Sequence, residues 1–137
     1  MADQKREWYE RLRPLCFRVW NGNEFTDECS VVMGKNGAEV MGLGIQPGEA
    51  IIQLGTGCQD SADHEIFEGD YLMTDEGNWV AVVVYDDNHG RFMCEDKLGG
   101  FSGCVNWGNC LVVGNVFEGI DKELVRREAE RRESAER

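Results

Sequence analysis

The stretch Trp79-Val80-Ala81-Val82-Val83-Val84-Tyr85 decides the fold class of this 137-residue chain. β-Branched and aromatic residues dominate it, and these residue types favour the pleated backbone of a strand. Side chains alternate between the two faces of a strand, so the even-numbered valines share one face and the alanine, valine and tyrosine share the other. Both faces are apolar. The stretch is therefore predicted to be a strand in the core or at a subunit interface.

Shorter apolar stretches lie on either side of this strand, and turn-forming residues such as Asn21-Gly22 separate them. The other predicted strands are 16–20, 24–33, 38–41, 50–54, 64–67, 71–73, 91–94, 104–107, 110–113 and 115–117. Short strands at intervals of about ten residues indicate a small barrel or sandwich. The pattern lacks the strand–helix alternation of a doubly wound parallel sheet.

Three parts are predicted along the chain. Residues 1–48 form an N-terminal helix and β-hairpin region, 49–120 a small β-barrel, and 121–137 a charged C-terminal helix. The N-terminal helix is expected at 3–12, and Pro14 ends it because proline disfavours helical geometry in the preceding residue.

The C-terminal helix is predicted from its residue types. Asp121 is placed to cap the first turn, and Ile120 with Val125 can form the hydrophobic contact across that cap. Two glutamate–arginine pairs at four-residue spacing support it, Glu123–Arg127 and Glu128–Arg132. Beyond Val125 the only apolar residues are two alanines. A helix without an apolar stripe is predicted to be solvated and frayed, the alternative being that a partner's charges hold it.

Charge is distributed unevenly along the chain. Residues 1–20 carry a net +2, residues 21–120 carry three basic and seventeen acidic side chains, and residues 121–137 sum to zero. Nucleic-acid binding requires lysine and arginine to neutralise phosphates, so this composition argues against it. An acidic surface suits a partner protein with a basic face, although high net charge also serves solubility alone.

Four stretches, in this order, resemble one known family. They are Phe17-Arg18-Val19-Trp20-Asn21-Gly22, Ile52-Gln53-Leu54-Gly55-Thr56-Gly57, Asp60 with Glu65-Ile66-Phe67-Glu68-Gly69-Asp70-Tyr71, and Val113-Gly114-Asn115-Val116-Phe117-Glu118. The family is YopX, small proteins of phages and prophages. The resemblance spans about residues 17–120 and departs from the family at 57–64 and 95–110. It implies a small barrel of the Src-homology-three-like kind with an N-terminal β region, a phage origin, and no established catalytic activity.

Glu68-Gly69-Asp70 is the most prominent candidate motif. Two carboxylates could bind a metal or transfer protons. The structural interpretation is a turn, in which Gly69 takes a backbone angle that other residues avoid and Asp70 accepts backbone hydrogen bonds. No further ligand stands at fixed spacing, so the turn is favoured.

The cysteines and histidines suggest no assembled centre. The six cysteines are Cys16, Cys29, Cys58, Cys94, Cys104 and Cys110, and none forms a Cys-x-x-Cys pair. Free structural thiols are therefore favoured over a metal site, with a site from Cys94, Cys104, Cys110 and His89 as the weaker alternative. Isolated His64 and His89 have no nucleophile to activate. Gly42-Leu43-Gly44 and Gly55-Thr56-Gly57 lack the lysine and following helix of a phosphate-binding loop. We expect no enzyme activity and no cofactor.

Aromatic residues are the candidate interface, because tryptophan and tyrosine are enriched among residues that dominate binding energy. The residues selected are Trp20, Trp79, Trp107 and Tyr85. The favoured function is a non-enzymatic phage protein that binds and blocks a basic face of a host protein, defence proteins among the targets. The alternative is a homo-oligomer that sequesters a nucleotide signal of host defence. A homo-oligomer is expected in either case. No apolar run approaches ~20 residues and no signal-like segment opens the chain, so we expect a cytoplasmic protein without membrane contact.

Overall fold

The computed structural model describes residues 17–26, 30–34, 37–41, 50–74, 79–96, 102–103 and 105–135. The predicted N-terminal helix, the Gly42-Leu43-Gly44 loop and Cys104 lie outside these residues. The chain divides into two compact units, residues 1–57 and 58–137.

The first unit contains three antiparallel pairings. Its strands are β1 (Phe17–Trp20), β2 (Phe25–Thr26), β3 (Ser30–Gly34), β4 (Gly37–Met41) and the first part of β5 (Ile51–Gln59). Strand β1 lies between β2 and β5, and β3 pairs with β4 in a separate hairpin. The predicted turn at Asn21 is confirmed, because the Asn21 side chain accepts hydrogen bonds from the backbone N–H groups of Asn23 and Glu24.

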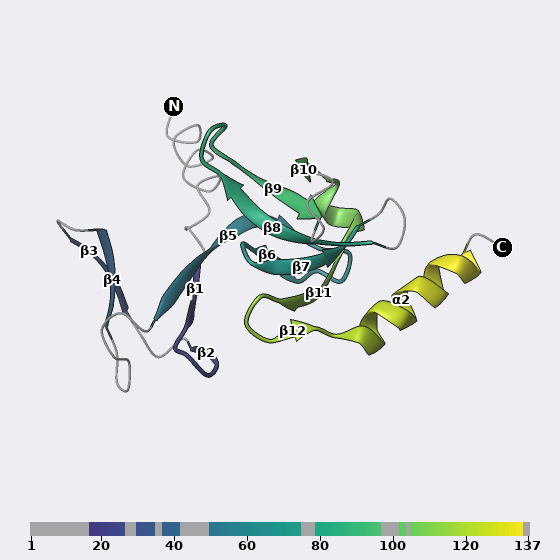
Figure 1. Ribbon diagram of the computed structural model, residues 1–137, viewed down its shortest axis with the longest axis horizontal. Coiled ribbons are helices and arrows are strands. Elements are labelled where there is room, and N and C mark those ends of the chain that lie inside the picture. The colour runs from purple at the N-terminus through teal and green to yellow at the C-terminus, as the bar shows by residue number, and fades with distance from the viewer. Residues whose placement is uncertain are drawn as a thin grey trace, which may run out of the picture. The chain divides into compact units, whose positions relative to one another are not determined.

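The second unit is built on a six-stranded antiparallel sheet in the order β10-β9-β8-β7-β11-β12 (Figure 1). Its strands are β6 (Glu65–Phe67), β7 (Asp70–Met73), β8 (Val80–Asp86), β9 (Arg91–Asp96), β10 (Ser102–Gly103), β11 (Leu111–Asn115) and β12 (Gly119–Ile120). A short 3-10 helix, η1 (Trp107–Asn109), and the helix α2 (Lys122–Ala135) complete it. Strand β5 continues into this unit and has β6 as its neighbour.

Apolar side chains form two clusters, one on each face of the six-stranded sheet. The first core cluster contains Ile66, Leu72, Ala81, Val83, Cys94 and Cys110. The second core cluster contains Met73, Leu111 and Val113. Strand β8 supplies Val83 to the first cluster and packs Val80 against the second. The prediction of a core strand with two apolar faces is confirmed.

The chain is mainly β with a C-terminal helix, as predicted, but the described strands do not close into a barrel. The sheet order ends at β10 and β12, and neither pairs with the other in the described part of the chain. Both edge strands are two residues long, which is too short for a continuous closing ladder. Helix α2 packs against the second core cluster, so a helix covers that face.

Three local predictions were wrong. The strand predicted at 115–117 is a turn after its first residue, because β11 ends at Asn115 and residues 116–118 lead into β12. Residues 55–59 continue strand β5 although their glycine and threonine content is typical of a loop, since pairing with a neighbouring strand outweighs a weak local preference. In the strand predicted at 104–107, the described residues 105 and 106 have no regular structure and Trp107 begins η1, where Cys110 donates its backbone N–H to the Trp107 carbonyl oxygen at 3.2 Å.

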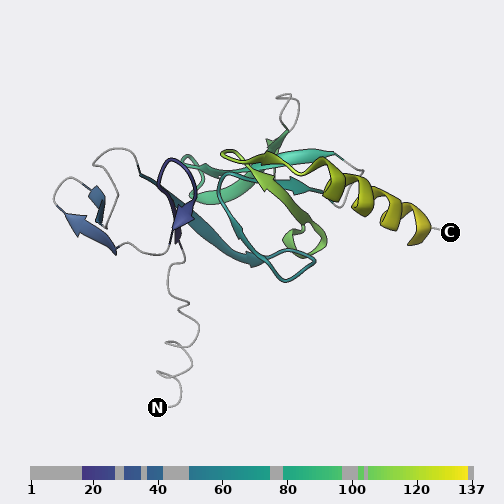
Figure 2. The ribbon, with the colours of Figure 1, turned by 90° about the horizontal axis from the view of Figure 1, so that it is seen from below.

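Helix α2 is packed rather than frayed, which corrects the prediction from its composition. Its cap is as predicted, since the Asp121 side chain accepts a hydrogen bond from the Leu124 N–H at 3.1 Å. Its three inward apolar residues contact the second core cluster and are Leu124, Val125 and Ala129. Figure 2 shows the helix continuing directly from β12.

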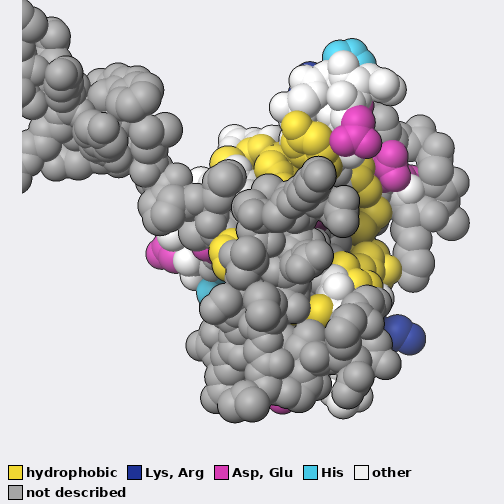
Figure 3. Space-filling model, turned by 90° about the vertical axis from the view of Figure 1, so that its left-hand side faces the viewer, with side chains coloured by type: hydrophobic (Ala, Val, Ile, Leu, Met, Phe, Trp, Pro, Cys, Tyr) yellow, Lys and Arg dark blue, Asp and Glu magenta, His cyan; other side chains and the backbone are white. Residues whose placement is uncertain are grey.

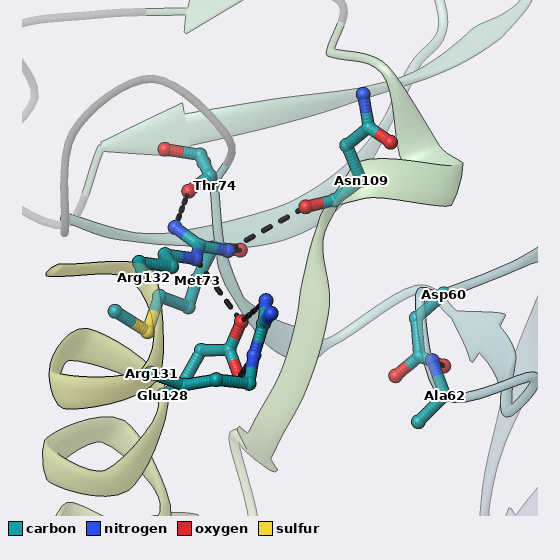
Figure 4. A network of polar contacts seen from close by, with 8 residues as sticks. All are labelled: Asp60, Ala62, Met73, Thr74, Asn109, Glu128, Arg131 and Arg132. Atoms are coloured by element: carbon teal, nitrogen blue, oxygen red, sulfur yellow. Dashed lines mark hydrogen bonds and ion pairs between the residues drawn. The ribbon is translucent and has the colours of Figure 1, made fainter. Parts of the chain in front are cut away.

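A charged contact completes the packing of α2 (Figure 4). The Glu128 side chain accepts hydrogen bonds from Arg131 at 2.6 and 2.9 Å and from Arg132 at 3.1 Å. Arg132 in turn donates to three backbone carbonyl oxygens outside the helix, those of Thr74, Met73 at 3.4 Å and Asn109 at 3.5 Å. Glu128 is only 8% exposed. The predicted Glu128–Arg132 pair therefore has a tertiary role that its spacing alone did not indicate.

Acid is expected to loosen α2 through Glu128. Hydrogen bonds from Arg131 hold the pKa of Glu128 below its ordinary value of 4.5; burial opposes this shift and the Arg132 hydrogen bond adds to it. A carboxyl with a lowered folded-state pKa stabilises the fold above its unfolded pKa, and this stability is lost as pH falls through the folded value. We expect hydrogen-exchange protection of α2, relative to β8, to fall below about pH 4.5.

Two substitutions test this assignment. Glu128→Gln should weaken α2 at neutral pH and remove most of the acid-dependent loss. Glu123→Gln is the matched control, because Arg126 also lowers the pKa of Glu123 but its side chain is 52% exposed, where an ion pair contributes little. Equal pH profiles for the wild type and Glu128→Gln would contradict the assignment.

Candidate interaction surface

The Glu68-Gly69-Asp70 motif lies at the turn between β6 and β7. Gly69 has φ +83°, its N–H donates to the Val83 carbonyl oxygen at 2.8 Å, and its own carbonyl oxygen accepts from the Val116 N–H at 2.9 Å. Asp70 is 1% exposed and accepts a hydrogen bond from the Phe67 N–H at 2.9 Å. These contacts hold the turn against two other segments, which is a structural role.

Asp60 has an anchoring role that the sequence analysis missed. Its side chain is buried, and Oδ1 accepts hydrogen bonds from the N–H groups of Ala62 at 2.9 Å and His64 at 2.8 Å. Its Oδ2 accepts from the N–H of Val112 at 2.9 Å. The turn chemistry of an aspartate two to four residues before its donors is visible in sequence. The contact to β11, 52 residues away, is not.

Two of the cysteines of the alternative metal site, Cys94 and Cys110, lie in the core. Both belong to the first core cluster, and Cys110 donates its S–H to the Asn106 carbonyl oxygen at 3.3 Å. His89 lies at the turn between β8 and β9 and contacts Asp86. Within the described ranges, no group of three histidine, cysteine, aspartate or glutamate side chains is arranged to hold a metal ion.

The four predicted interface residues differ in how far they are buried. Trp79 and Trp107 are half-buried and pack against the first core cluster, so their area stabilises the fold. Trp20, in the first unit, is half-buried in an edge-to-face contact with Phe25 at 5.1 Å between ring centroids. Tyr85 is 43% exposed. Among these four residues, Tyr85 is the one that is exposed rather than half-buried.

Tyr85 lies in a part of the β8–β9 hairpin that extends past the neighbouring strands (Figure 1). Strand β7 pairs with β8 only at residues 80–82, and β10 pairs with β9 only at residues 94–95. Beyond these points β8 and β9 pair with each other, with Tyr85 opposite Phe92. We call residues 84–93 the distal hairpin.

The Tyr85 ring contacts Phe92, and its hydroxyl lies near the turn of the hairpin. Its ring lies edge-to-face with Phe92, with 5.1 Å between centroids and an interplanar angle of 68°, and Phe92 packs against the first core cluster. Its hydroxyl lies over the turn, since a Cβ built on Gly90 would be 3.7 Å from that oxygen. Figure 3 shows hydrophobic side chains gathered below a histidine-bearing tip, with acidic side chains beside them.

At the turn of the distal hairpin, the Asp86 carboxylate is held by contacts with neighbouring residues. The Asp86 Oδ2 atom lies 2.7 Å from His89 Nδ1 and 4.0 Å from Arg91 Nε, and Oδ1 accepts from the Asn88 N–H at 3.1 Å. The hydrogen bond with His89 is the main cause that lowers the pKa of Asp86, and the carboxyl is ionised at neutral pH. Asp87 beside it is exposed.

Carboxylates dominate the accessible charge of the second unit before α2. In the described part of residues 58–120, eight acidic side chains are exposed or half-buried, and Arg91 is the one lysine or arginine. The acidic residues are Asp63, Glu65, Glu68, Asp86, Asp87, Glu95, Asp96 and Glu118. The excess predicted from the sequence therefore lies on accessible positions.

A mainly β fold with a packed C-terminal helix and an accessible carboxylate surface is the class of protein this structure defines. The family model described as YopX protein matches residues 16–120, and the chain belongs to the YopX family. The resemblance noted in the sequence is thereby confirmed.

The structure is also similar to the crystal structure of protein EF1440 from Enterococcus faecalis. The two are 21% identical, the match covers 81% of this chain and 97% of that one, and the TM-score is 0.48. No curated protein matches the chain. In the part of the chain that the structure describes, no helix combines the length and apolar character needed to span a membrane.

Proposed function

We propose that this protein is a non-enzymatic interaction protein of phage or prophage origin whose second unit docks on a basic face of a host protein and blocks what that face normally binds. The supporting observation is the ratio of eight accessible carboxylates to one arginine among the described residues of 58–120. Charge of one sign steers a partner of the opposite sign and favours its binding. The phage setting, with action in the host cytoplasm, comes from the resemblance to the family.

Non-enzymatic action is favoured by the positions of the chemically capable side chains. Asp60 and Asp70 are buried and accept backbone hydrogen bonds, while Cys94 and Cys110 are in the core. A catalytic group must reach a substrate atom within hydrogen-bond distance. Among the described residues of 58–120, most of the charged side chains that reach solvent are carboxylates, an arrangement that suits binding better than turnover.

Self-association is part of the proposal, but the two apolar faces of β8 no longer support it. The sequence suggested it because β8 is apolar on both faces, and both faces contact core clusters of the same chain. Its remaining support is Trp20, a half-buried tryptophan that belongs to neither core cluster. Light scattering that finds only a species of about 15 kDa would remove it.

A salt-dependent pull-down from bacterial host lysate tests the function. The wild-type chain is expected to retain a basic protein at low salt and to release it at high salt, because screening weakens contacts between exposed charges. Glu65→Gln with Glu95→Gln should retain less of the same protein. Glu65 is half-buried at its position and Glu95 is exposed, so both substitutions should leave the core unchanged.

The control is Glu123→Gln with Glu130→Gln, which removes the same charge from α2. Arg126 contacts both of these glutamates and Arg127 contacts Glu123, so two arginines already balance their charge. This variant should behave as the wild type does. Retention that responds neither to salt nor to Glu65→Gln with Glu95→Gln would contradict the proposed function.

A further inference from the structure

We propose that the distal hairpin (residues 84–93) is the part of this protein that contacts the partner. In this proposal Tyr85, together with Asp87 two residues later in the chain, binds an arginine side chain of the partner. This inference rests on the proposed function and deepens it. The proposed function requires only an acidic surface, whereas the inference assigns one place on that surface and one side-chain chemistry in the partner.

The first argument is that Tyr85 is both accessible and held in place. It is 43% exposed, yet Phe92 contacts its ring and the turn at Gly90 lies against its hydroxyl. Phe92 connects this pair to the first core cluster. An aromatic anchor that is already ordered loses little conformational entropy on binding, which is the property of residues that dominate interface energies.

The second argument is charge. A tyrosine ring attracts a cation over its face, and a perpendicular neighbour such as Phe92 covers at most one of the two faces. Asp86 is already engaged by His89 and Arg91, while Asp87, the next residue, is exposed. A cation over the Tyr85 ring would thus have an exposed carboxylate two residues further along the chain, in the turn that follows β8.

The third argument selects arginine over lysine. A guanidinium is planar, so it can stack on a ring and donate hydrogen bonds to a carboxylate at the same time, which a compact ammonium cannot. The same chain uses this contact internally, since the Arg18 guanidinium lies 4.3 Å from the centroid of the Phe25 ring while its Nε donates to Gln53 at 2.8 Å. We expect the partner to present arginine in the same manner.

The test uses the full-length, isotope-labelled chain and two defined probes, a short oligo-arginine peptide and an oligo-lysine peptide of equal length. NMR titration at low salt should give chemical-shift changes centred on residues 84–93. The arginine peptide is expected to bind about threefold more tightly than the lysine peptide. Tyr85→Ala should abolish this preference, and Asp87→Asn should weaken both peptides.

Two control variants distinguish the specific effect of the Tyr85 ring from loss of exposed apolar surface and from misfolding. Val116→Ala truncates a residue that is 46% exposed elsewhere in the second unit and should leave the preference unchanged. Tyr85→Phe keeps the ring and should retain it. If Tyr85→Ala does not fold, the wild-type shift map and Tyr85→Phe decide the question.

Three outcomes would overturn the inference. Shift changes spread evenly over the carboxylates, with no preference for arginine, would refute the contact at the distal hairpin and leave the proposed function standing. Absence of binding by either peptide at low salt would count against both. Concentration-dependent broadening of residues 84–93 without any peptide would assign the distal hairpin to a second copy of this chain instead.

Discussion

Replacing Gly114 by alanine is expected to destabilise the folded chain by about 4 kcal/mol, enough to unfold many small domains. Gly114 lies where the pairing of β11 with β7 shifts register, at φ +151°. A Cβ at this position would lie 2.0 Å from the Gly119 carbonyl oxygen and 2.9 Å from Ile120 Cα. These are backbone atoms of β12, so the clash can be relieved only by separating the two strands that lead into α2.

Urea unfolding measured by circular dichroism checks this expectation against Gly108→Ala. A Cβ on Gly108 would be 3.8 Å from the nearest atom, the side-chain oxygen of Asn106, which is an ordinary contact. We expect Gly108→Ala to change stability by less than about 1 kcal/mol. Equal stabilities of the two variants would show that β11 and β12 do not approach each other as described.

Substitution of Asp60 should be nearly as damaging, with a loss of about 3–4 kcal/mol for Asp60→Ala. The change would leave three N–H groups without their acceptor, those of Ala62, His64 and Val112. Asp60→Asn keeps the shape but can direct only one carbonyl oxygen at them. Its amide N–H₂ would then face a backbone donor, so it should also destabilise, by about 2 kcal/mol.

Asp63→Asn is the matched control for Asp60→Asn. Asp63 is exposed in the same turn and has φ +63°, a conformation that asparagine also tolerates. Thermal unfolding should therefore separate the two asparagine variants clearly. A melting temperature for Asp60→Asn equal to that of Asp63→Asn would mean that the Asp60 carboxylate does not join the turn to β11.

Local residue preferences were sufficient for the elements whose stability is local. The valines of β8 predict a strand with two apolar faces, and Asp121 predicts the start of α2, because each depends on neighbours in sequence. Asn21 likewise predicts its own turn. These elements needed no knowledge of distant contacts.

The missed features depend on contacts between distant residues. Residues 55–59 belong to β5 although their composition resembles a loop, and β5 has β6 as a hydrogen-bonded neighbour. Helix α2 packs apolar residues only as far as Ala129, and beyond it Arg132 reaches carbonyl oxygens 23 to 59 residues away and places charge on the packed face. Asp60 looks like an ordinary turn residue until β11 is brought beside it.

The candidate surface was predictable in part. The acidic excess of residues 21–120 follows from counting, and the accessible carboxylates of the second unit agree with it. The choice among aromatic residues did not follow from counting, because burial separates Trp79 and Trp107 from Tyr85. Only the pairing limits of β7 and β10 reveal that Tyr85 lies on a projecting hairpin.

The most direct test of the account is the salt dependence of affinity for the host protein retained in the low-salt pull-down. Isothermal titration calorimetry should show affinity falling steeply as salt rises, with Glu65→Gln and Glu95→Gln together costing about fivefold at low salt. The pair Glu123→Gln and Glu130→Gln should match the wild type. An affinity that is unchanged by salt and by all of these substitutions would contradict an account in which the carboxylates of the second unit hold the partner.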